Sequence, residues 1–397
     1  MSLVLTALSY VAPFLAVLVL VITVHEFGHF LAARGFGVAI ERFSVGFGRA
    51  LFSHRDRSGI EWRIGWIPVG GYVMFAGDEN AASIPDQDDL DAMRREIVGR
   101  EGPGAERRYL PFKPVWQRAI VAAAGPAANF LLAIAIFAAI FMTIGEGILK
   151  PRVGAVVAGS PAAAAGFQPG DLITQADGKP VSDFLQLHRD VAPHAGVPMT
   201  FVVQRGSSVI ALRVTPVHDK QTYDAIIGIM PSTSAGDFVH VRDNPITAVA
   251  AGARDTWDIV STTVVYIGRL FRGQESPHQL TSFIGIAQVS HMAVVDGARG
   301  EHGLVAQAMG SLVALTGLVA FISVSIGLAN LMPIPVLDGG HLLFYAYEAI
   351  ARRPVSAKVQ AFSYRVGLAL VIGLMLFATT NDLQRIHLLR FLGGHFS

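Results

Sequence analysis

The sequence predicts an α-helical membrane protein with four transmembrane helices and one soluble α+β domain inserted between the second and third of them. Of its 397 residues, 52% are hydrophobic and only 15% are charged, which is too little charge for a soluble protein of this length. The apolar residues are concentrated in four segments, each close to or above the ~20 residues that cross a bilayer. A long stretch of lower hydropathy separates the second segment from the third.

Composition also limits the metal ligands, nucleophiles and partners that the chain can have. The chain has no cysteine, which excludes disulfides, thiolate metal ligands and cysteine nucleophiles, so a metal would need His, Asp or Glu. A formal net charge of +1 gives no indication of a nucleic-acid partner.

The first span is predicted to be retained rather than cleaved as a signal peptide, because it is long and no basic residue precedes it. We expect the chain to be divided into a first span at 1–34, a cytoplasmic loop at 35–117, a second span at 118–145, a soluble domain at 150–218, an amphipathic segment at 244–303, a third span with its following loop at 304–340, a juxtamembrane helix at 341–358, a fourth span at 359–380 and a tail at 381–397.

Basic residues close to the spans predict the orientation. They gather in the loop at 35–117 and in the connection between the third and fourth spans, and short loops rich in Lys and Arg stay in the cytoplasm. The two termini and the soluble domain are then expected on the opposite side of the membrane.

The most informative motif is His25-Glu26-Phe27-Gly28-His29, at the far end of the first span. Helical residues four apart differ by about 400° of rotation and ~6 Å of rise, so the two imidazoles can share one metal ion. Glu26 lies about 100° around the helix from His25, where it can act as a general base on a metal-activated water. The alternative is a pair of merely hydrogen-bonded histidines, but ionisable residues in a membrane span are expected to be functional.

A third ligand is expected from the end of the third span. Pro333 and Pro335 cannot continue a regular helix, so the backbone should unwind there, which is tolerated at membrane depth only around an enclosed or wet cavity. Asp338 would present a carboxylate inside that cavity, and His341 is the competing ligand. Alternatively, Asp-Gly-Gly is only a turn at the membrane surface.

Two further segments have strand-like patterns. Residues 61–75 are rich in Trp, Ile, Val and Tyr and predict two short strands forming a hairpin around Pro68 and Gly70-Gly71. Within the soluble domain, residues 199–204 and 209–215 alternate like strands, and residues 184–191 have a helical pattern.

Taken together, these motifs resemble the site-2 protease family of intramembrane zinc metalloproteases. The resemblance rests on residues 25–29 and 330–340, and it extends to Gly125-Pro126-Ala127-Ala128-Asn129-Phe130, to residues 67–73 and to residues 355–366. It implies one Zn²⁺ per chain bound by His25, His29 and Asp338, with Glu26 as the catalytic acid and base. It also implies that the hairpin at 61–75 re-enters the membrane. The residues it assigns to substrate binding are Asn330, Pro333, Pro335, Asn129, Gly70, Gly71 and Tyr72.

The soluble domain resembles a circularly permuted bacterial PDZ domain, through residues 160–173 and 177–181. The resemblance implies a peptide groove at Ala165, Gly166 and Phe167, whereas the alternative is a folded spacer with no bound peptide. Only residues 218–243 remain before the next predicted segment, so a second copy does not fit.

The function that the resemblance implies is regulated intramembrane proteolysis in a bacterial inner membrane. The substrate would be a single-span membrane protein of the anti-sigma factor type, or a remnant signal peptide, held in the lipid bilayer and already cut outside by an upstream site-1-type protease. A catalytically silent PDZ scaffold is the main alternative, and retention of Glu26 argues against it. A metal transporter is a weaker alternative, because metal transport gives a lone general base no chemical role.

Overall fold

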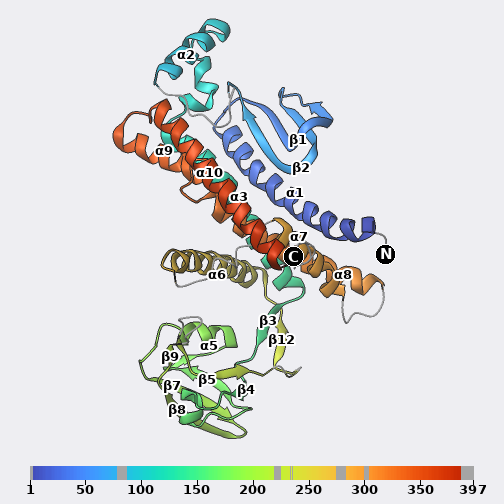
Figure 1. The fold of residues 1–397 in the computed structure, drawn as a ribbon, viewed down its shortest axis with the longest axis vertical. Coiled ribbons are helices and arrows are strands. Elements are labelled where there is room, and N and C mark those ends of the chain that lie inside the picture. Colours follow the sequence, from blue (N-terminus) through green and yellow to red (C-terminus); the bar gives the residue numbers. More distant parts are fainter. Residues whose placement is uncertain are drawn as a thin grey trace, which may run out of the picture. The chain divides into compact units, whose positions relative to one another are not determined.

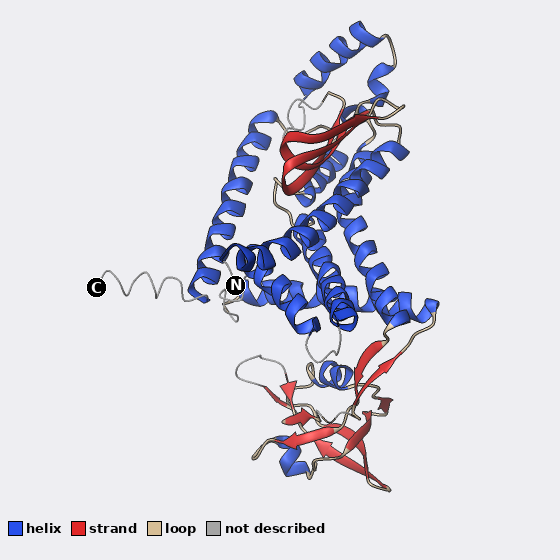
Figure 2. Cartoon of the chain, turned by 90° about the vertical axis from the view of Figure 1, so that its right-hand side faces the viewer, coloured by secondary structure: helices blue, strands red, loops and turns tan. Residues whose placement is uncertain are grey.

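The computed structural model describes residues 3–77, 87–218, 225–232, 234, 236–273, 283–298 and 304–385. The chain divides into two compact units, one formed by residues 1–138 and 249–397 and the other by residues 139–248. Figures 1 and 2 show the elements of both.

Among the described residues of the first unit, four helices are long and apolar enough to cross a membrane. They are α1 (Leu3–Gly35), α3 (Val115–Thr143), α8 (Leu304–Asn330) and α10 (Ala357–Arg385) (Figure 1). Only 11–33% of each apolar window is buried, which fits helices whose outer faces contact lipid. Each of the four predicted spans therefore contains one such helix.

Small residues allow α1, α3 and α8 to approach closely. A Cβ atom on Gly28 of α1 would collide with the carbonyl oxygen of Ala124 in α3, and one on Gly327 of α8 would lie 3.2 Å from the Cβ of Asn129. Farther along, Val21 of α1 packs with Ile322 of α8 in a buried cluster. Such close crossings are typical of helix packing in membranes, and here they bring the polar residues of three helices together.

Two long strands, β1 (Ile40–Arg55) and β2 (Glu61–Phe75), form the sheet beside α1 (Figure 1). The first half of β1 lies between the two halves of β2, since Phe43 pairs with Val73 and also with Trp62. The predicted hairpin within 61–75 is therefore wrong: its two halves pair with β1, not with each other. Apolar packing explains the insertion, because Phe43 fits against Phe30 of α1 with ring centroids 5.6 Å apart.

The third span stops at Asn330, as the prolines predict, and a helix begins again at Asp338, three residues before the predicted start of the juxtamembrane helix. The other helices of the first unit are α2 (Gln87–Glu101), η1 (Ala105–Arg108), η2 (Leu110–Phe112), α6 (Pro245–Phe271), α7 (Phe283–Ala298) and α9 (Asp338–Ala351). Most of the predicted tail at 381–397 lies outside the described residues.

The second unit is an α+β fold around one apolar core. Its largest sheet has the strand order β6-β5-β7-β8, and β4 pairs with β11, β3 with β12 and β9 with β10. The bounds are β3 (Glu146–Leu149), β4 (Val153–Val156), α4 (Pro161–Ala165), β5 (Leu172–Ala176), β6 (Lys179–Pro180), α5 (Phe184–Val191), β7 (Met199–Arg205), β8 (Ser208–Val214), β9 (Val217–His218), β10 (Ala225–Ile226), β11 (Ile229–Pro231) and β12 (Phe238–Val241).

One prediction about this unit is wrong. The domain does not end at 218, because Ile227 is buried in its core and Ile229 packs against that core. The groove at Ala165, Gly166 and Phe167 stays a prediction, and the Phe167 side chain itself is 5% exposed, with its ring 5.9 Å from that of Phe201 in the same core. Gly166 forms the left-handed C-cap of α4, with φ 85°.

Candidate metal centre and active-site cavity

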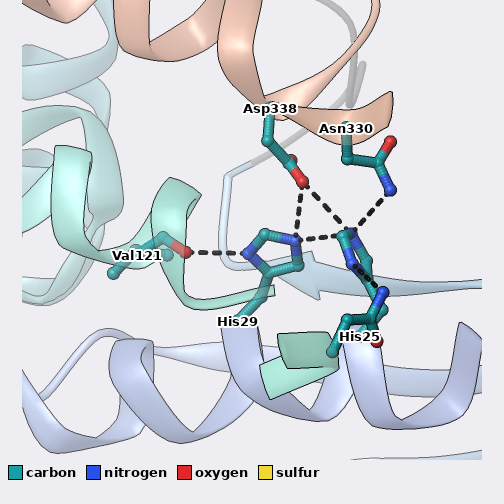
Figure 3. A network of polar contacts seen from close by, with 6 residues as sticks. His25, His29, Val121, Asn330 and Asp338 are labelled. Atoms are coloured by element: carbon teal, nitrogen blue, oxygen red, sulfur yellow. Dashed lines mark hydrogen bonds and ion pairs between the residues drawn. The ribbon is translucent and has the colours of Figure 1, made fainter. Parts of the chain in front are cut away.

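The two histidines of the motif face each other across one turn of α1 (Figure 3). Their Nε2 atoms are 3.2 Å apart, and both side chains are nearly buried. The Nδ1 atom of His29 lies 2.7 Å from the carbonyl oxygen of Val121 in α3. A carbonyl only accepts hydrogen bonds, so Nδ1 must carry a proton, and in the neutral imidazole the lone pair of Nε2 is then free.

Asp338 completes the cluster from the first residue of α9 (Figure 3). Its Oδ2 atom lies 3.1 Å from Nε2 of His25 and 3.5 Å from Nε2 of His29. The loop that carries it is compact, because Cβ atoms on Gly339 and Gly340 would collide with carbonyl oxygens of residues 331–334. The unwound segment is thus a packed support for the carboxylate.

These three atoms fit a zinc ion. Ligands about 2.0–2.1 Å from a tetrahedral ion are about 3.3 Å from one another, and the three separations here are 3.1, 3.2 and 3.5 Å. In addition, Asp338 Oδ2 is buried and receives no hydrogen bond from the described part of the chain. Two imidazole nitrogens and a carboxylate oxygen that converge in this way are the expected surroundings of a cation.

Glu26 lies next to this cluster rather than in it. It lines the same cavity, and its carboxylate is within reach of the backbone N–H of Val73 in β2. A Cβ on Gly71 would lie only 3.2 Å from Cγ of Glu26. The absence of a side chain at Gly71 therefore lets the strand approach the glutamate.

The competing ligand His341 is held elsewhere. Its Nε2 atom is 2.9 Å from the hydroxyl oxygen of Tyr364 in α10. Asn330, the last residue of α8, instead places its Nδ2 atom 3.5 Å from Nε2 of His25. Of the two candidates, it is Asp338 that meets the imidazoles.

A cavity of about 600 Å³ opens in front of the cluster. Its polar surface includes Glu26, Asn330 and Tyr72, whereas apolar side chains such as Ile22 and Ile326 form much of the wall. Gly70, Gly71 and Tyr72 of β2, which the resemblance assigns to substrate binding, line it as well. The cavity can therefore receive an apolar chain beside the ionisable groups.

Three predicted substrate contacts lie outside this cavity. Asn129 is fully buried, with its Nδ2 atom 3.3 Å from Nδ1 of His25, so it lies behind the histidine. Pro333 and Pro335 are also absent from the lining, and Cδ of Pro335 packs near Gly367 of α10. The prolines shape the loop instead of touching the cavity, because an imino ring ends the helix.

Sequence reasoning missed two contributors to the site. A Cβ atom on Gly125 of α3 would collide with Nε2 of His29 and with Cε1 of His25. Arg118, also on α3, forms an ion pair of 2.5 Å with Glu348 and stacks over Tyr345, which fastens α9 to α3. A glycine in an apolar helix is a recognisable sign of close packing, whereas the Arg118–Glu348 pair joins residues too distant in sequence to be matched.

The comparisons with known proteins agree with this chemistry. The family model for peptidase family M50 matches residues 13–374. Metalloprotease MmpA of Caulobacter vibrioides is 48% identical over 389 residues, covering 96% of this chain and 97% of that protein. Relatives named as zinc metalloproteases come from Agrobacterium fabrum, 40% identical with 95% and 96% covered, and from Rhizobium meliloti, 41% identical with 97% and 99% covered.

A solved PDZ domain, from an SdrC-like protein of Listeria monocytogenes, matches 21% of this chain and 87% of that domain at 20% identity. Its TM-score of 0.20 is too low to support any argument. The family match and the relatives, by contrast, extend over nearly the whole chain. The chain therefore belongs to peptidase family M50 and is a zinc metalloprotease.

Proposed function

We propose that this metalloprotease is an intramembrane endopeptidase that cuts single-span membrane proteins. The observation that carries the proposal is the position of the cluster: His25 and His29 belong to a helix whose apolar window, Ser9–Gly35, could itself cross a bilayer. A protease with its metal ligands on such a helix can reach peptide bonds that water-soluble proteases cannot.

In this proposal His25, His29 and Asp338 hold the zinc ion. When bound, the ion polarises the scissile carbonyl and lowers the pKa of water. Glu26 takes the proton from the attacking water and then passes it to the leaving amine. The amide of Asn330, at the rim of the cluster, helps to hold the substrate strand.

The substrate must first lose its helical hydrogen bonds, because a helix hides its carbonyl groups within i to i+4 bonds. Residues 70–73 of β2 lie at the cavity with backbone groups that can pair with an extended chain. Leu51, Phe52 and Trp66 of the same sheet are 59–73% exposed. We propose that these apolar side chains dip into the bilayer, and that the edge formed by residues 70–73, on the opposite side of the sheet from Leu51 and Phe52, accepts the substrate as an added strand.

The biological setting follows from the same proposal. The substrate is of the anti-sigma factor type or is a remnant signal peptide, and an upstream site-1-type protease makes the first cut. The enzyme lies in the bacterial inner membrane with both termini and the PDZ-like unit outside, while the catalytic cluster faces the cytoplasmic side. The basic residues in the loop at 35–117 support this orientation.

The test uses the full chain in detergent or liposomes, with a single-span model substrate shortened on its outer side. We expect a cut within or next to the span, identified by mass spectrometry of both fragments. Removal of zinc by a chelator should abolish the cut and added zinc should restore it. Cleavage confined to soluble peptides, with every membrane substrate left intact, would contradict the proposal.

A further inference from the structure

Asn129 is a fully buried polar residue in the middle of α3, at the point where α1, α3 and α8 meet. Its Nδ2 atom lies 3.3 Å from Nδ1 of His25, whereas its Oδ1 atom is buried and has no hydrogen-bond partner among the described residues. Burying an unpaired amide oxygen costs stability, so its presence next to the metal centre needs an explanation.

The explanation lies in what His25 needs in order to bind a metal. Its Nε2 atom faces His29 and Asp338, so this nitrogen must offer its lone pair to the ion. A neutral imidazole that does so carries its proton on Nδ1, and that proton requires an acceptor. For His29 the acceptor is the carbonyl oxygen of Val121; for His25 the neighbour is Asn129.

An asparagine side chain can offer either atom to a neighbour, because its oxygen and nitrogen are nearly equal in shape. With Nδ2 toward His25, the amide would favour the tautomer that protonates Nε2, the wrong one for a ligand. A half-turn of the carboxamide brings Oδ1, the atom without a partner, onto Nδ1–H.

We propose that Asn129 is a positioning residue of the metal centre: its Oδ1 accepts the Nδ1 proton of His25 and so selects the tautomer that binds zinc. The inference rests on the zinc site proposed above and adds a residue that the motif had assigned to the substrate. Outer partners of this kind typically change metal affinity by about 10–100-fold.

The test measures the zinc dissociation constant of the full-length protein by competition with a chromophoric chelator. Asn129→Leu keeps the size of the side chain but removes the acceptor, and we expect it to weaken zinc binding by about 10–100-fold. Asn129→Asp keeps an acceptor in the same place, and we expect it to bind zinc at least as tightly as the wild type.

The matched control is Ser323→Ala. The Ser323 hydroxyl donates to the backbone carbonyl of Asn129 at 2.9 Å, at the same helix crossing. We expect this variant to bind zinc like the wild type. The zinc affinity of Ser323→Ala therefore shows whether a change in packing at the helix crossing is enough to weaken zinc binding without removing the acceptor.

Three results would overturn the inference: wild-type affinity in Asn129→Leu, a loss in Asn129→Asp as large as in Asn129→Leu, or an equal loss in Ser323→Ala. His25→Ala and Asp338→Asn, measured in parallel, separate it from the proposed function. If His25→Ala and Asp338→Asn keep wild-type affinity, the zinc site itself is assigned wrongly. If these two variants lose zinc and Asn129→Leu does not, the zinc site stands and only the role given to Asn129 is wrong.

Discussion

At the scale of single residues, the metal centre depends on how little space surrounds it. His25 and His29 project from one face of α1, and the backbone of α3 passes directly behind them at Gly125. The two imidazoles could be predicted as a pair, because their spacing of four residues matches the helical repeat. The empty space at Gly125 could not be predicted as part of the site, because it depends on where a second helix crosses the first.

Gly125→Ala should strongly weaken zinc binding. Its methyl group would collide with Nε2 of His29 and with Cε1 of His25, so the ligands must move or the helices must separate. We expect zinc per purified chain to fall well below the wild-type value. Gly317→Ala is the control, because a Cβ atom there has nothing within 4 Å; zinc retention equal to that of the control would contradict the geometry.

Asp338→Asn should weaken zinc binding by more than the about 10–100-fold typical of outer partners, because it removes a charged ligand. His341→Phe should leave the affinity largely unchanged, since Nε2 of His341 is engaged by Tyr364. Isothermal or chelator titration of both variants distinguishes the two candidates. Loss of zinc only in His341→Phe would show that the third ligand had been assigned to the wrong residue.

At the scale of elements, local patterns were sufficient for helices but not for strand partners. The four apolar helices follow from hydropathy alone, because each must satisfy its own backbone in lipid. The partner of β2 could not be predicted in the same way: residues 61–75 have the composition of strands, yet the strand between their halves comes from residues 40–47. Long-range pairing is decided by packing, here of Phe43 on α1, and not by local composition.

In the second unit, an ion pair joins the end of β7 to the loop after α4. Asp171 is fully buried and accepts hydrogen bonds from Arg205 at 2.7 and 2.8 Å and from the backbone N–H of Gln168 at 2.9 Å. Burial alone would raise the pKa of the Asp171 carboxyl, but the bonds from Arg205 and Gln168 outweigh it, so the pKa lies below its usual range. The carboxylate therefore contributes stability above the unfolded-state pKa of about 3.9, and that contribution is lost as the pH falls through the lower, folded-state pKa.

This predicts that Asp171→Asn destabilises the second unit by about 1.5–3 kcal/mol near neutral pH. The difference from the wild type should shrink as the pH falls from about 4 toward 2. Limited thermolysin digestion at neutral pH and pepsin digestion at acid pH, read by cleavage within 139–248, provide the two measurements. If the wild type and Asp171→Asn lost stability by the same amount on acidification, the stabilising role of the Asp171–Arg205 ion pair would be contradicted.

At the scale of the whole molecule, the order of spans and inserted domain could be predicted, and the end of the domain could not. The predicted limit at 218 follows from the last alternating strand, but the chain returns through β10 and β11 to close the core with Ile227. A short strand of two or three residues has too little pattern to be recognised. The inserted unit is nevertheless one compact body of residues 139–248.

If this unit acts as a filter, its removal should relax substrate selection. We expect a chain lacking residues 152–231 to cleave single-span substrates that still carry their outer domain, which the full chain leaves intact. Cleavage of the shortened substrate serves as the control and should continue in both proteins. Unchanged selectivity would leave the unit as a folded spacer.

The mechanism separates proton transfer by Glu26 from zinc binding by three other residues. Cleavage of a shortened single-span substrate and the amount of bound zinc, both measured in Glu26→Gln, distinguish these two roles. We expect cleavage to fall by about 10²–10⁴-fold, while zinc remains at one ion per chain as in the wild type. Turnover equal to that of the wild type, with zinc still bound, would contradict the mechanism.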